Sequence, residues 1–136
     1  RMPANACSRL LEERTDLIVT AYPRTEWELR KTCRAPGPLL GVGWPQHYGL
    51  EPGDELAAIR EALDAASTHP RVLLVEVPAR GSSLAPSAAA LRALLQERCE
   101  IVATRSAVRD PHYSVKKWWQ PDVSEWRFEA TTWDCR

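Results

Sequence analysis

The sequence predicts an α/β fold: a single-domain layered fold with a mixed, mainly parallel central sheet, flanking helices and an antiparallel C-terminal edge strand. Between residues 52 and 104, two amphipathic helical patterns alternate with two short apolar runs that are typical of buried strands. The segment 124–134 instead alternates apolar and polar residues, which indicates a strand with one exposed face. A chain of 136 residues is the usual size of one domain. We therefore expect a single domain over 1–136, and because Arg1 is a poor natural start, we expect a fragment or processed piece of a longer chain.

The first third of the chain predicts two short helices and two strands. Residues 7–14 place a capping serine before two leucines, which is typical of a short helix. Residues 15–22 are rich in β-forming side chains, and Pro23 ends that run. Residues 24–33 predict another short helix. The proline- and glycine-rich stretch that follows predicts a loop, with a short strand at 39–42.

The middle of the chain carries the clearest alternation of elements. Residues 52–66 predict a helix, because leucine, isoleucine and alanine recur on one face at helical spacing. Residues 71–77 form a continuous apolar run, residues 81–99 predict a second helix, and residues 100–104 predict the next strand. The helix between these strands is long enough for a crossover, so they are expected to be parallel neighbours. Residues 105–122 have no regular pattern.

Composition and charge exclude several classes of function. Eighteen basic residues balance eighteen acidic ones, and no long block of one charge occurs. A nucleic-acid partner is therefore less favoured than a protein, because phosphate binding usually requires an excess of Lys and Arg. No apolar run approaches the roughly 20 residues that span a bilayer. Phosphate-loop, dinucleotide and hydrolase-elbow motifs are absent, and we expect no cofactor.

The cysteines have no spacing that identifies their role. Cys7, Cys33, Cys99 and Cys135 contain no C-x-x-C pair and no histidine at zinc-site spacing, so no metal site is expected. Their even number permits two disulfides in an oxidising environment. A chain of this length needs no covalent staples, and we therefore favour free thiols in a reducing, intracellular compartment.

One strand end carries a candidate catalytic acid, Glu76. The stretch "VLLVEVPARG", followed by a helix and a strand, is similar in layout to nucleases in which an acid on one strand and a Glu-x-Lys pair on the next hold Mg²⁺. Pro78 stands where the lysine is required. Asp16 is the best upstream acid. These residues predict, as the alternative function, a small metal-dependent hydrolase or a degenerate form of one. The competing interpretation is that Glu76 pairs with a nearby arginine.

The same edge of the sheet is a candidate anion or nucleotide site. Ligands of open α/β sheets bind outside the carboxyl ends of the strands. Arg80 and Arg105 are expected at that edge, next to a helix that begins near Ser83. A helix N-terminus with two arginines is a favourable place for an anion.

The leading functional prediction comes from the tryptophans. Six occur in the chain, and four of them are Trp118, Trp119, Trp126 and Trp133. On the predicted last strand, Trp126 and Trp133 lie on opposite sides, and adjacent tryptophans at 118 and 119 cannot easily share one buried face. Because tryptophan is enriched at binding hot spots, the chain is predicted to be a non-enzymatic protein-interaction or regulatory domain. Its partner is expected to be another protein or a second copy, bound through residues 111–136.

Overall fold

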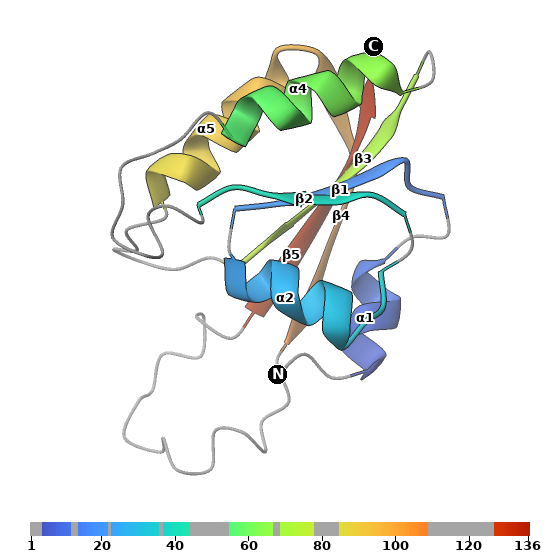
Figure 1. Cartoon of the computed structure of the whole chain (residues 1–136). Helices are drawn as coiled ribbons and strands as arrows, with labels where there is room; N and C mark the ends of the chain where they lie inside the picture. Colours follow the sequence, from blue (N-terminus) through green and yellow to red (C-terminus); the bar gives the residue numbers. More distant parts are fainter. Residues whose placement is uncertain are drawn as a thin grey trace.

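The computed structural model describes residues 4–11, 14–21, 23–35, 37–43, 55–66, 69–77, 85–108 and 127–136. In these ranges the chain forms one mixed sheet that is covered by helices on both faces (Figure 1). The strands are β1 (Leu17–Thr20), β2 (Leu39–Gly41), β3 (Arg71–Glu76), β4 (Cys99–Val108) and β5 (Arg127–Cys135). The helices are α1 (Ala4–Leu10), α2 (Pro23–Lys31), α4 (Glu55–Ala65) and α5 (Ala85–Gln96). The predicted α/β class is confirmed.

The strands follow the order β2-β1-β3-β5-β4 across the sheet. β1 pairs in parallel with both β2 and β3, whereas β5 is antiparallel to β3 on one side and to β4 on the other. The sheet is therefore half parallel and half antiparallel, rather than mainly parallel. The edge strand next to β5 is β4, which has ten residues and is antiparallel to β5.

Two predictions about neighbours in the sheet are wrong. The C-terminal strand is not at the edge, and β3 and β4 run in the same direction but are not adjacent, because β5 lies between them. The alternation in β5 indicated one exposed face, yet Thr131 and Thr132 are both buried. Threonine counts as a polar residue when a sequence is examined for alternation, but its branched side chain packs well inside a sheet. This strand is therefore covered on both faces.

Each face of the sheet has its own hydrophobic core. On one face, Ile59 and Leu63 of α4 and the leucines of α5 pack against the β3 side chains Val72 and Leu74. On the other, Leu10 of α1 and Leu29 of α2 pack against the remaining β3 side chains. The spacing of four residues between Ile59 and Leu63 keeps both on the inner side of their helix. Full burial of such a side chain contributes about 1.5–3 kcal/mol to stability.

Both pairs of cysteines are oxidised, which corrects the expectation of free thiols. Cys7 of α1 is bonded to Cys33, just beyond the end of α2, and Cys99 of β4 is bonded to Cys135 of β5. The first disulfide belongs to one core and the second to the other. Sequence spacing could not show this, because four cysteines allow three pairings and only the fold brings partners together.

Most predicted elements are confirmed, with shifted ends. The strand expected at 100–104 is the main exception, because β4 continues to Val108 through residues that looked irregular. A β-bulge at Ile101/Ala103 interrupts its alternation, which obscured the pattern. The rest of the segment without a regular sequence pattern, 109–122, lies outside the described residues. None of the described helices is long and apolar enough to cross a membrane.

Candidate binding site

Glu76 ends β3 and is held by an arginine. The Nη2 atom of Arg92 on α5 donates to Glu76 Oε1 at 2.6 Å, and Arg92 Nε donates to the same oxygen at 3.0 Å. The Glu76 side chain is 12% exposed. A largely buried carboxylate that is occupied by one guanidinium has little remaining capacity to bind a metal ion. The interpretation of Glu76 as the paired polar end of a core strand is confirmed.

Asp16 lies at the other end of the sheet. It precedes β1, and its Oδ2 accepts a hydrogen bond of 2.8 Å from the backbone N–H of Arg71, the first residue of β3. Five residue steps along β3 separate Arg71 from Glu76, which is roughly 16 Å at about 3.3 Å per residue. The structure therefore does not bring Asp16 and Glu76 together. The described residues contain no group of three or more metal-ligating side chains.

The remaining predicted binding residues are dispersed. Arg105 lies within β4, where its Nη2 donates to the backbone oxygen of Leu10 at 2.9 Å and so connects α1 to the sheet. Trp133 is buried in the core, with 1% of its surface exposed. Both therefore have structural roles in the described chain. The other four, Arg80, Trp118, Trp119 and Trp126, lie outside the described residues.

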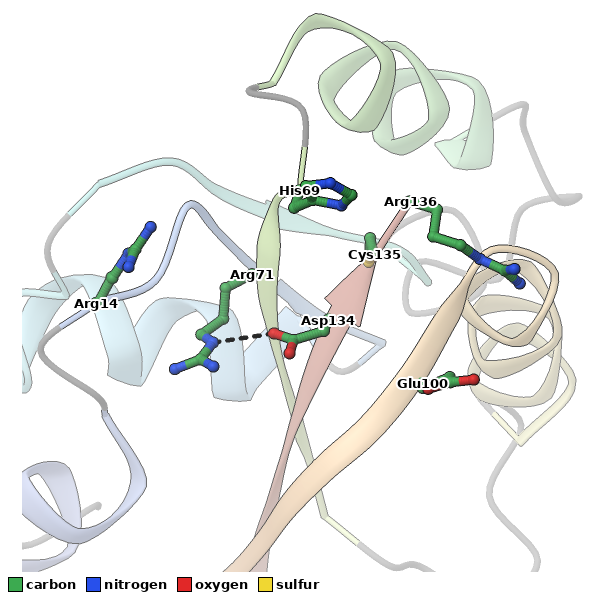
Figure 2. A pocket seen from close by; sticks show the side chains of 7 residues that line it. All are labelled: Arg14, His69, Arg71, Glu100, Asp134, Cys135 and Arg136. Carbon is green, nitrogen blue, oxygen red and sulfur yellow. Dashed lines mark hydrogen bonds and ion pairs between the residues drawn. The ribbon is translucent and has the colours of Figure 1, made fainter.

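A cavity of about 350 Å³ opens at the Asp16 end of the sheet. Its lining residues are Arg14, His69, Arg71, Glu100, Asp134, Cys135 and Arg136 (Figure 2). Arg71, Asp134 and Glu100 form a row across three neighbouring strands, since Arg71 is opposite Asp134 and Asp134 is opposite Glu100. Directly opposite residues share a face of a sheet. The strand register therefore assembles this charged row.

Only some of the charged side chains that line the cavity form ion pairs with other described residues. Arg71 Nε donates to Asp134 Oδ1 at 3.1 Å. In the part of the chain that the structure describes, the guanidinium groups of Arg14 and Arg136 have no hydrogen-bond or ion-pair partner. In Figure 2, Arg14 and Arg71 lie on one side of Asp134, Glu100 and Arg136 lie on the other, and His69 lies above it.

The edge strand β4 begins at this cavity. Glu100 lines the cavity, and the next two residues, Ile101 and Val102, are 46% and 50% exposed. The bulge at this point leaves both apolar side chains near the surface. Within the described ranges, no strand pairs with the outer edge of β4. An exposed apolar edge strand thus adjoins a charged cavity.

Sequence reasoning did not find these residues. Arg14, His69 and Arg136 have no local motif, and the Arg71–Asp134 contact joins residues 63 positions apart. The sequence carries a weak signal for the exposed start of β4. In "EIVA", which follows Cys99, two apolar residues come one after the other, so they do not alternate with polar ones. The same run also fits a buried parallel strand, which is what the sequence pattern predicts.

The Glu76–Arg92 pair gives a first testable prediction. Replacing Arg92 with methionine is expected to lower the free energy of unfolding by about 1–3 kcal/mol, because a largely buried carboxylate loses its partner. Arg60→Met, at an exposed position on α4, is the matched control and is expected to change stability by less than about 0.5 kcal/mol. Urea denaturation followed by circular dichroism measures both. Equal losses in the two variants would show that the ion pair is unimportant.

The chain matches no protein-family model, no curated protein and no solved structure.

Proposed function

We propose that this chain is a non-enzymatic protein-interaction domain that associates with a second copy through the edge of β4. The observation that carries the proposal is the exposure of Ile101 and Val102 on a ten-residue edge strand. An edge strand presents unpaired backbone N–H and C=O groups, which a strand of another chain can satisfy. Two identical strands related by a twofold axis pair antiparallel, and twofold dimers are the commonest oligomers.

The expected interface is weak. Covering the exposed half of Ile101 and Val102 contributes about 1 kcal/mol per side chain, and each new backbone hydrogen bond contributes about 0.5–1.5 kcal/mol. Association itself costs at least about 4 kcal/mol of lost freedom. The bulge at Val102 and the charge of the nearby Glu100 also limit regular strand pairing. Bulges and charged residues limit pairing in the same way at the sheet edges of other proteins. These magnitudes support a reversible dimer rather than open-ended strand addition.

The two disulfides support an oxidising environment for this interaction. Disulfides persist in extracellular and other oxidising compartments and are rare where thiols are kept reduced. All four cysteines are paired, and each disulfide connects two separate elements. We therefore infer that the domain works outside reducing compartments, in contrast to the intracellular compartment that chain length favoured.

Light scattering across a range of concentrations tests the proposed dimer. The wild type is expected to shift reversibly from the mass of one chain toward the mass of two. Val102→Lys is expected to remain monomeric, because the added charge prevents a partner strand from approaching the edge. Ala58→Lys adds the same charge at an exposed position on α4 and is expected to behave like the wild type. A wild type that is monomeric throughout would contradict the proposal.

A further variant separates this interface from the one that the tryptophans predict. Trp118→Ala/Trp119→Ala changes two residues of the segment 111–136 that lie outside the described residues, and it leaves β4 unchanged. If the dimer survives this change and is lost in Val102→Lys, the edge of β4 is the interface. Loss of the dimer in the tryptophan variant alone would place it in that segment instead.

A further inference from the structure

We propose that the cavity at the Asp16 end of the sheet binds a carboxylate group, and that Arg14 and Arg71 hold it. This site is separate from the dimer contact, because its arginines come from the segment before β1 and from the start of β3. The β4 edge contributes only Glu100 to the lining. The inference therefore stands whether or not the chain dimerises.

Arg71 is held in place before any ligand arrives. Its backbone N–H donates to Asp16, and its Nε donates to Asp134. Its two Nη atoms have no hydrogen-bond partner among the described residues. A guanidinium that is fixed at Nε and free at Nη loses little conformational freedom when an anion binds.

Arg14 supplies a second guanidinium, which has no hydrogen-bond or ion-pair partner among the described residues. Its side chain lines the same cavity, and Figure 2 shows it on the same side of Asp134 as Arg71. Asp16 and Asp134, the acids next to Arg71, already accept hydrogen bonds from its backbone N–H and its Nε, whereas the Arg14 guanidinium has no partner among the described residues. Arg–carboxylate pairs are planar and often bidentate, which makes these hydrogen bonds both strong and directional.

Charge and size together favour a carboxylate over a phosphate. Asp134 and Glu100 occupy the same row as Arg71, so a doubly charged phosphate would face two carboxylates, whereas a singly charged group meets less repulsion. A volume of about 350 Å³ is near the lower limit for small-molecule sites. The cavity therefore fits a small acid or the end of a peptide, both of which carry the same group.

A nuclear magnetic resonance titration tests the site. The experiment uses the Val102→Lys chain at constant ionic strength, with the backbone amide and the Nε–H of Arg71 as probes, so that self-association does not contribute. The added compounds are acetate, inorganic phosphate, a short alanine peptide with a free C-terminus, and the same peptide with an amidated C-terminus. Saturable shifts are expected with acetate and the free peptide. No saturable shift with either compound would overturn the proposal, as would tighter binding of phosphate than of acetate.

Variants assign the binding to the arginines. Arg14→Gln is expected to weaken carboxylate binding about tenfold or more, because it removes one charge-assisted contact. Arg71→Lys keeps the charge but removes the planar donor pair, and it is expected to have a similar effect. Arg60→Gln makes the same charge change on α4 and is expected to bind as tightly as the parent chain. Unchanged binding in Arg14→Gln and Arg71→Lys would overturn the assignment.

The two peptides identify the source of the group. If the free peptide binds at least about tenfold more tightly than acetate and the amidated peptide does not bind, the site takes the C-terminus of a protein or peptide. If acetate and the free peptide bind equally, the site takes a small free acid. Both outcomes support carboxylate binding. Equal binding of the free and amidated peptides would overturn it, because the amide lacks the charge.

Discussion

Replacing Trp133 with alanine is expected to lower the free energy of unfolding by about 3–5 kcal/mol, because it opens a cavity in a packed core. Trp133 is 1% exposed and is among the largest fully buried side chains. It lies on β5 between Val72 of β3 and Ile101 of β4, on the face that α4 and α5 cover. Guanidinium denaturation followed by circular dichroism measures the loss.

Two further variants test the cause of that loss. The indole Nε1 of Trp133 donates to Thr131 Oγ1 at 2.9 Å. Thr131→Val keeps the shape but removes this acceptor, and it is expected to cost about 1–3 kcal/mol, because a buried donor is left without a partner. Trp27→Ala is the matched control: Trp27 is 56% exposed on α2, so its removal is expected to cost less than about 0.5 kcal/mol. If both tryptophan variants cost the same, Trp133 does not have the role in the core that is described above.

Local periodicity predicted the elements but not their order in the sheet. The helical spacing of Ile59 and Leu63 predicted α4 and its buried face, and both residues belong to the core. The alternation of β5 correctly separated Phe128 from Trp133, which belong to opposite cores. Strand order depends on contacts between distant segments, and no local pattern records that β5 inserts between β3 and β4. The helix between the two strands therefore predicts a crossover between neighbours, whereas β5 separates the two strands in the sheet.

The candidate site was even less predictable. Its charged row depends on strand register, which places Arg71 opposite Asp134 and Asp134 opposite Glu100. A local motif can predict a site only when its residues are close in the sequence or on one repeating face. Glu76 and Asp16 are metal-site candidates in the sequence because acids at strand ends often bind metals, but the two acids lie at opposite ends of β3. The competing prediction is that Glu76 pairs with a nearby arginine. One neighbouring helix is enough to supply that arginine, and the contact with Arg92 of α5 confirms the prediction.

Removing either disulfide is expected to destabilise the chain by about 3.5 kcal/mol, because each cross-link limits the freedom of the unfolded chain. The sequence separations are similar, 26 residues for Cys7–Cys33 and 36 residues for Cys99–Cys135, so the two losses are expected to be nearly equal. Guanidinium denaturation of Cys7→Ala/Cys33→Ala and Cys99→Ala/Cys135→Ala measures them. Each single replacement is expected to cost about as much as its double, since one cysteine cannot form the bond.

The two disulfides are expected to differ in their effect on the cavity. Cys135 lines it, and Cys99 precedes Glu100, so this disulfide holds β4 and β5 together beside the charged row. Cys7–Cys33 instead connects α1 with the segment after α2 and does not line the cavity. Under conditions in which both double variants are folded, carboxylate binding is expected to weaken in Cys99→Ala/Cys135→Ala and to stay unchanged in Cys7→Ala/Cys33→Ala. An equal loss of binding in both would mean that stability alone, rather than the cross-link beside the cavity, controls the site.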